Sequence, residues 1–238
     1  MTDRPAAPRL RAATYNIHSC VGRDGRYHPG RIADVLAEIG ADVFGLQEVD
    51  SRPHRTETID QFRFLAQETG LHAVAGPNIR NESGQYGNVL LSTHPILGHR
   101  LIDLSEPGRE ARGAIAADLK VAGAALRVVT THLGLRLGER RRQIAKLAAS
   151  LTDDGTPTLF LGDFNIWGPE RIVLRRLGAS AGRGSPRTYP SGWPLFALDR
   201  MWCLGAARAS ALRTHRSALA RRASDHLPLV GDIEIGTK

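Results

Sequence analysis

The stretch TLFLGDFN, residues 158–165, is an apolar run that ends in a glycine, a carboxylate and an amide. This pattern predicts a short buried strand over residues 158–161 that delivers polar groups at its end. Gly162 lets the backbone approach a ligand closely. Asp163 can orient or deprotonate a water molecule, and Asn165 can donate to a phosphoryl oxygen as charge builds on it. An ordinary turn after a strand explains the same residues, so the interpretation depends on the rest of the chain.

Four other segments share this form, a run of strand-forming residues that ends in a group able to bind a metal ion or a phosphate. They are residues 14–18 (TYNIH), 46–50 (LQEVD), 130–133 (TTHL) and 224–228 (SDHLP). One such segment carries little information. Five in one chain predict a single shared site, rich in carboxylates, amides and imidazoles and suited to phosphoryl chemistry with a hard metal.

Glu48 is the principal candidate for a metal ligand. It follows the apolar residues 43–46 and is therefore expected where a buried strand reaches the surface. A carboxylate there suits Mg²⁺, which takes few protein oxygens and keeps several waters, and Mn²⁺ is an alternative. Asn16 is expected to add an amide oxygen beside it. A glutamate at a strand end is, taken alone, more often a solvated turn residue.

Asp225 and His226 place an acid next to an imidazole. If this segment is extended, neighbouring residues point to opposite faces, so Asp225 is poorly placed to pair with His226 and is available for the metal. Another acid must then orient the ring, and Asp199 is our candidate. A protonated His226 can neutralise a phosphoryl oxygen, and a nearby carboxylate would raise its pKa. Outside a site, an Asp-His pair is more often a surface or capping feature.

Further residues are candidates for contacts with the substrate. His132 ends an apolar run and is expected to contact the phosphate. Arg112 precedes a predicted strand and can clamp a phosphate with two hydrogen bonds. Asn88, which follows a glycine, is expected to bind substrate beside it. Arg109 is the weaker candidate, because an exposed loop charge explains it.

The chain has 238 residues, of which 42% are hydrophobic, enough for one large domain with a substantial core. We expect residues 1–8 to form a flexible N-terminus and residues 9–238 a single domain. The formal net charge of +8 favours anionic partners, although free use of arginine explains it equally well. Cys20 and Cys203 lack the spacing of a zinc ribbon or a redox motif.

The N-terminal residues 1–11 lack the apolar core of a signal peptide, and no stretch approaches the length of a membrane span. We therefore expect a cytoplasmic protein, with peripheral contact to an anionic membrane left open, and we expect a monomer. A basic segment over residues 208–222 precedes Asp225. It can hold either a nucleic-acid backbone or an anionic bilayer.

The hydrophobic pattern predicts a mixture of hairpins and helix-covered strands. Strands are expected over residues 9–16, 43–47, 88–92, 115–121, 126–131, 158–161, 197–203 and 229–235, and helices over 29–39, 57–69, 139–151 and 169–177. This mixture indicates an α/β fold of the α+β kind, with two mixed β-sheets packed face to face and helices outside. The polar strand ends would then meet at one rim.

Several common catalytic motifs are absent from the sequence. It contains no G-x-S-x-G elbow, no G-x-x-x-x-G-K-[ST] loop, no H-E-x-x-H helix and no G-x-G-x-x-G turn. The sequence therefore does not indicate a serine hydrolase, a P-loop NTPase, a zinc protease or a dinucleotide-binding enzyme.

In this order, the five segments resemble the endonuclease/exonuclease/phosphatase superfamily. The stretch 131–135, followed by Glu139, Arg140 and Gln143, is most similar to compact bacterial members of that family. The resemblance spans residues 9–235, nearly the whole chain. It implies a four-layer α/β sandwich with the site at one edge of the two central sheets, and a hydrolase that acts on phosphoric ester bonds.

The resemblance also implies a role for each candidate by position. The roles are metal binding for Asn16 and Glu48, phosphate contact for His132, water activation and transition-state stabilisation for Asp163 and Asn165, orientation of the histidine for Asp199, and a closing acid–imidazole pair for Asp225 and His226. The expected function is magnesium-dependent hydrolysis of a phosphodiester in nucleic acid or in a phospholipid headgroup. A phosphomonoesterase acting on a small molecule or lipid, and an inert module that binds polyanions, are the alternatives.

Overall fold

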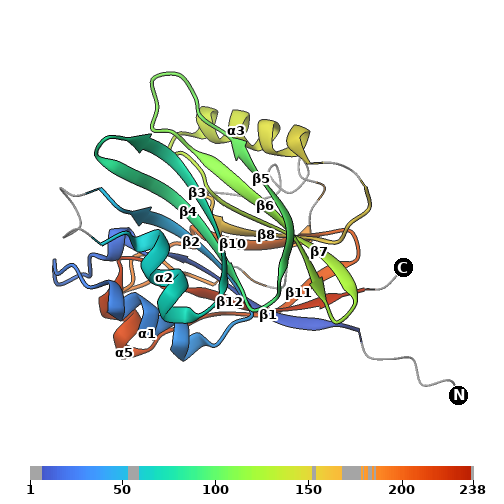
Figure 1. The fold of residues 1–238 in the computed structure, drawn as a ribbon, viewed down its shortest axis with the longest axis horizontal. Coiled ribbons are helices and arrows are strands. Elements are labelled where there is room, and N and C mark those ends of the chain that lie inside the picture. Colours follow the sequence, from blue (N-terminus) through green and yellow to red (C-terminus); the bar gives the residue numbers. More distant parts are fainter. Residues whose placement is uncertain are drawn as a thin grey trace, which may run out of the picture.

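Two six-stranded β-sheets pack face to face in the computed structural model, which describes residues 7–52, 59–151, 154–167, 178, 180–181, 184 and 186–236 (Figure 1). The strands of the first sheet are, in pairing order, β11 (Ala207–Thr214), β12 (Leu229–Ile235), β1 (Arg9–Asn16), β2 (Val43–Asp50), β4 (Gly84–Ser92) and β3 (His72–Asn81). Those of the second sheet are β5 (Ile96–Asp103), β6 (Gly113–Val121), β7 (Ala124–His132), β8 (Thr158–Asp163), β10 (Asp199–Leu204) and β9 (Ser180–Ala181).

Helices cover the outer faces of both sheets (Figure 1). They are α1 (Pro29–Ile39), α2 (Gln61–Thr69) and α5 (Ala218–Ala223) on the first sheet and α3 (Leu137–Ser150) on the second, and a short 3₁₀ helix spans His18–Cys20. The molecule is thus a sandwich of four layers, and the fold class expected from the sequence is confirmed.

Three apolar clusters fill the spaces between these layers. The central cluster joins the two sheets and includes Leu90, Val128 and Leu161. The sheets approach so closely there that a Cβ on Gly45 would lie 1.9 Å from Cδ1 of Leu161, so only glycine fits at this position. The outer clusters lie under the helices, and each central strand is therefore buried on both faces.

The helix ends follow from local chemistry. Pro29 occupies the first turn of α1, and Gly40 ends the helix in the left-handed region at φ 56°. The Asp60 side chain accepts hydrogen bonds from the backbone N–H groups of Phe62 and Arg63, so α2 begins at Gln61. We expected this helix to begin near residue 57, which lies outside the described residues, as does the helix expected over 169–177.

Four strands escaped the sequence interpretation. Three of them, β3, β5 and β11, lie at sheet edges and expose many of their residues, and the two-residue edge strand β9 is the fourth. The pattern of an edge strand is weak because only part of one face is buried. β2 is also longer than expected and continues through Glu48 to Asp50.

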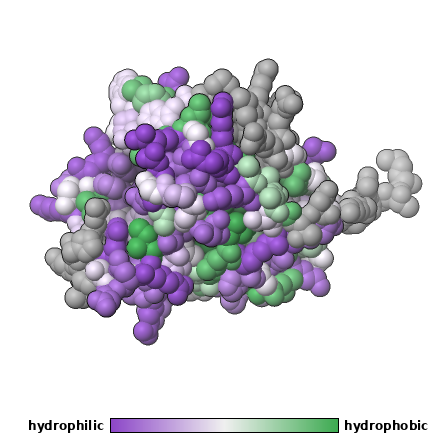
Figure 2. Space-filling view, turned by 90° about the horizontal axis from the view of Figure 1, so that it is seen from above, coloured by the Kyte–Doolittle hydropathy of each residue, from purple (hydrophilic) through white to green (hydrophobic). Residues whose placement is uncertain are grey.

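The surface seen from the side of α3 is mostly hydrophilic, with hydrophobic residues in small separate groups (Figure 2). Among the described residues, no helix combines the length and the apolar character needed to cross a membrane.

Candidate active site

One edge of the sandwich receives the polar strand ends from both sheets. β1 runs parallel to β2, and β7 runs parallel to β8, so their carboxyl ends point the same way within each pair. Asp163 is in register with His132 on one neighbouring strand and with Asp199 on the other. The sequence segments that end in polar residues therefore do converge.

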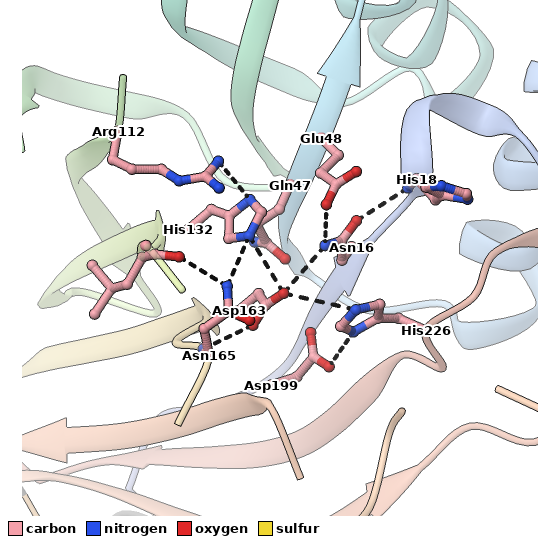
Figure 3. A network of polar contacts seen from close by, with 12 residues as sticks. Asn16, His18, Gln47, Glu48, Arg112, His132, Asp163, Asn165, Asp199 and His226 are labelled. Atoms are coloured by element: carbon pink, nitrogen blue, oxygen red, sulfur yellow. Dashed lines mark hydrogen bonds and ion pairs between the residues drawn. The ribbon is translucent and has the colours of Figure 1, made fainter. Parts of the chain in front are cut away.

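Asp163 lies at the centre of this group (Figure 3). One carboxylate oxygen, Oδ2, accepts a hydrogen bond from Nδ2 of Asn16 at 3.2 Å and lies 3.5 Å from Nε2 of His132 and 3.8 Å from Nε2 of His226. The other oxygen accepts from the backbone N–H of Asn165 at 2.9 Å. Burial raises the pKa of Asp163, and the positive charge of His226 opposes this rise.

His226 is oriented by Asp199, whose Oδ2 lies 2.8 Å from Nδ1 of the ring. The same oxygen accepts a hydrogen bond from the Thr188 hydroxyl at 2.5 Å. Burial disfavours a charged imidazole, but the carboxylates of Asp199 and Asp163 outweigh it and raise the pKa of His226 to about 10. His226 is therefore an imidazolium at neutral pH.

Asp163, Asp199 and His226 hold their ligand atoms within 4.8 Å of one another, close enough to share a metal ion. We interpret this trio differently. Nδ1 of His226 already faces Asp199, and its Nε2 lies 3.8 Å from Oδ2 of Asp163, so both ring nitrogens face a carboxylate. The trio is better described as an acid–imidazole–acid chain.

Glu48 provides the carboxylate that fits a hard cation. A β-bulge between Leu46 and Val49 shifts the register of β2, and Glu48 adopts a φ of 57°, which is unusual for a residue other than glycine. Its Oε1 accepts a hydrogen bond from Nδ2 of Asn16 at 2.9 Å, and the side chain lines a cavity. The Oδ1 of Asn16 accepts from the backbone N–H of His18 at 3.1 Å, so Glu48 is the oxygen ligand that faces open space. A carboxylate in this position is consistent with Mg²⁺, which retains several waters.

Asp225 lines the same cavity from another side. Its Oδ1 lies 3.9 Å from Nδ1 of His18 and accepts a hydrogen bond from the Ser224 hydroxyl. Among the described contacts, none joins Asp225 to Glu48 or Asn16. The expected metal role of Asp225 therefore stays a prediction without a supporting contact.

Two donor groups and one carboxylate, that of Asp163, lie next to the ring of His132. Nη1 of Arg112 lies 3.3 Å from its Nδ1, and Nδ2 of Asn165 lies 3.1 Å from its Nε2. Burial, together with the positive charges of Arg112 and His226, lowers the pKa of His132 well below 6.5. The ring is thus neutral in the folded protein at neutral pH.

The neutral His132 predicts a loss of stability in acid. Below pH 6.5 the unfolded chain gains a proton at this position that the folded chain cannot accept. The free energy of unfolding of the wild type, minus that of His132→Gln, should fall by up to about 1.4 kcal/mol per pH unit over this range. Urea unfolding at about pH 7 and about pH 5 measures the difference. His72→Gln on exposed β3 is the matched control, and an equal response of both variants contradicts the prediction.

The two residues expected to bind substrate differ in position. Arg112 is buried and lines the cavity, where its Nη1 also pairs with Glu110 at 2.7 Å. Within the described part of the chain, its Nε is buried and finds no hydrogen-bond partner. Asn88 lies deeper and donates to the backbone oxygen of Gly113 at 3.0 Å. It is not among the residues described as lining the cavity.

The cavity has a volume of about 390 Å³, and its lining includes residues outside the predicted set. Lining residues that the sequence interpretation missed are Ser19, Arg52, Tyr86, Glu110, Leu135, Trp167, Tyr189 and Leu198. Tyr86, Glu110 and Trp167 lie two residues from predicted site residues, and Leu198 is adjacent to Asp199. This proximity in sequence is the signal that could have found these four. Buried Gln47, which donates to the Thr130 hydroxyl across the two sheets, was also missed.

The molecule is a two-sheet α/β sandwich with carboxylates, amides, imidazoles and a guanidinium at one edge. This combination is typical of enzymes that act on phosphate esters. The chain belongs to the Endonuclease/Exonuclease/phosphatase family, which its residues 13–226 match. This confirms the family resemblance stated for the sequence. Members of the family are generally divalent-metal-dependent phosphoesterases.

Similar proteins extend over the full length of the chain. The uncharacterized protein YbhP of Escherichia coli K12 is 31% identical over 259 residues, which cover 99% of this chain and 100% of YbhP. The structure of an endonuclease/exonuclease/phosphatase from Beutenbergia cavernae superposes with a TM-score of 0.78 at 23% identity, over 96% of this chain and 72% of that one. The mannosyl-6-phosphatase Bt3783 of Bacteroides thetaiotaomicron superposes with a TM-score of 0.69 at 17% identity, over 96% of this chain and 100% of that one.

Proposed function

We propose that this protein is a divalent-metal-dependent phosphodiesterase, which hydrolyses a P–O bond by in-line attack of water within a single domain over residues 9–238. The observation that carries the proposal is the buried Asp163 carboxylate, held between the Asn16 amide and the imidazolium of His226. General bases work best when their pKa lies near the operating pH, and burial moves the pKa of Asp163 in that direction.

The neighbouring groups fit complementary roles. Asp163 accepts a proton from the attacking water, while the imidazolium of His226 lies close enough to neutralise charge on a phosphoryl oxygen. Asp199 keeps that imidazole charged and fixes its orientation. Arg112 places a guanidinium at the cavity wall, and the neutral His132 sets the position of the Asn165 amide.

Glu48 and Asn16 are the residues proposed to hold Mg²⁺, or Mn²⁺ in its place. A cation bound there supplies Lewis-acid polarisation of the phosphate and stabilises the leaving oxygen. Asp225 would serve this site through water, because it faces the cavity from another side.

The charge balance of the cavity favours a diester over a monoester. The lining includes the carboxylates of Glu48, Glu110, Asp163 and Asp225, against the cations of Arg52, Arg112 and His226. Asp50 and Asp199 pair with Arg52 and His226, so one divalent cation leaves the site without a positive excess. This balance suits the single charge of a phosphodiester better than the double charge of a monoester. Nucleic acid and phospholipid headgroups both contain such a diester.

A phosphoester panel tests the metal requirement. We expect turnover of bis(4-nitrophenyl) phosphate above that of 4-nitrophenyl phosphate, complete loss with EDTA, and recovery with Mg²⁺ or Mn²⁺. Glu48→Gln should lower the rate by about a hundredfold and raise the metal concentration needed for half-maximal activity, because a neutral amide binds cations weakly. Glu68→Gln, the same change at an exposed position of α2, should behave as wild type. Turnover that survives chelation, or equal rates in both variants, contradicts the proposal.

A further inference from the structure

Large hydrophobic side chains are exposed on segments that also line the cavity. They lie in three segments, 133–137, 164–167 and 188–198, each of which contributes a residue to the cavity wall. The apolar rim, as we name it, consists of Leu135, Leu137, Trp167, Trp193, Leu195 and Phe196. Of the large hydrophobic side chains that are exposed in the described part of the chain, only Leu97 and Leu101 lie outside it.

The rim is continuous with the catalytic group. Trp167 packs against Phe196 with ring centroids 4.8 Å apart and meets the edge of Tyr189 at 6.4 Å. Tyr189 in turn lies 4.8 Å from the ring of His226. An apolar wall therefore leads from the proposed reaction centre out to the surface.

A tightly bonded hairpin over residues 188–196 carries the most exposed part of the rim. The backbone N–H of Thr188 donates to the carbonyl of Phe196, and the backbone N–H of Ser191 donates to the carbonyl of Asp225 at 2.6 Å. The Ser191 hydroxyl donates to the carbonyl of Ser224 at 2.7 Å. These bonds fix Trp193, which is 76% exposed, relative to the proposed active site. A large exposed indole held in place is typical of a contact surface.

Arginines flank the rim. The guanidinium of Arg23 lies against Gly192, where a Cβ would be 2.3 Å from its Nη1, and Arg221 donates to the Gly192 carbonyl at 3.1 Å. Arg136 is exposed between two rim leucines in the sequence. Indoles and leucines bordered by cations are characteristic of surfaces that settle into the interface of an anionic bilayer.

We propose that the apolar rim docks onto an anionic phospholipid bilayer, with the cavity mouth facing the membrane. The substrate class then becomes a phospholipid headgroup diester, and this second part rests on the proposed function. Half of the rim is aliphatic, and leucine has no π-face on which a nucleic-acid base could stack. The rim therefore fits a bilayer better than a single strand of nucleic acid.

Vesicle flotation tests the docking surface without reference to activity. The full chain should float at physiological ionic strength with phosphatidylcholine vesicles that contain roughly one-third phosphatidylglycerol, and much less with phosphatidylcholine alone. Trp193→Ala should lower the partition coefficient about tenfold, and Leu137→Ala about threefold. Leu97→Ala is the matched control. Leu97 is 66% exposed near the start of β5, at the opposite end of the strand from Asp103, which pairs with Gly113. This variant should float as wild type.

Two further measurements complete the test. Brominated lipids should quench the fluorescence of the wild type more than that of Trp193→Phe. Hydrolysis of soluble bis(4-nitrophenyl) phosphate should be equal in wild type and Trp193→Ala, because Trp193 is not among the residues described as lining the cavity. The proposal is overturned by wild type that does not float, by rim variants that float normally, or by Trp193→Ala that loses oligonucleotide binding instead. Flotation that depends on Trp193 supports the docking surface even when no phosphoester is hydrolysed, and only the proposed function then fails.

Discussion

Replacing Asp163 with asparagine should lower the turnover of bis(4-nitrophenyl) phosphate by about a thousandfold. The asparagine amide keeps the shape of the side chain and removes its ability to accept a proton from water. Asparagine offers one oxygen where aspartate offers two, so the hydrogen bond from the backbone N–H of Asn165 can persist, while the new Nδ2 replaces the oxygen that accepts from Asn16. The loss should therefore appear in kcat and leave KM nearly unchanged.

Two controls separate catalysis from folding. Asp34→Asn makes the same chemical change at an exposed position of α1 and should retain full activity. The thermal midpoint of Asp163→Asn should stay near that of the wild type, since burial already disfavours the charged carboxylate at this position. A folded Asp163→Asn protein with a rate within tenfold of the wild type would remove Asp163 from the mechanism.

The convergence of distant segments could be anticipated because it follows from short-range rules. A buried strand ends where polar residues begin, and parallel neighbours end at the same edge of a sheet. These rules place His132 beside Asp163 and bring the end of β1, at Asn16, next to the end of β2, where Gln47 is its partner in register. Asp199 is the acid next to the ring of His226, although residues 225 and 226 form a bend before β12 and not the extended segment that the expectation assumes.

Features that depend on packing between distant parts could not be read from the pattern. The bulge that turns Glu48 toward the cavity interrupts a strand whose residues look regular in sequence. The hairpin over 188–196 is held by the backbone of residues 224–225, and no local periodicity predicts that pairing. In the sequence alone, Trp193 cannot be distinguished from other loop residues, because its exposure depends on residues distant in the chain.

Asp199→Asn should lower turnover by about a hundredfold to a thousandfold at neutral pH, through its effect on His226. In the wild type, the carboxylate outweighs burial and keeps the imidazole charged up to a pKa of about 10. Without that carboxylate, burial acts against the charge with less opposition, so the pKa of His226 must fall. Part of the lost rate should return at lower pH, where the imidazole of His226 regains its proton. Protonation of Asp163 then limits the rate, because a protonated carboxyl group cannot accept a proton from water.

An NMR titration of the His226 ring distinguishes this role from a merely structural one. The ring should titrate at lower pH in Asp199→Asn than in the wild type. Thr188→Val offers a graded comparison, because it removes only the hydroxyl that donates to Asp199 at 2.5 Å and leaves the carboxylate facing the ring. Its effects on rate and on the pKa of His226 should be small and in the same direction as each other. An unchanged pKa of His226 in Asp199→Asn, or a rate loss of the same size at every pH, would show that Asp199 does not act through the imidazolium.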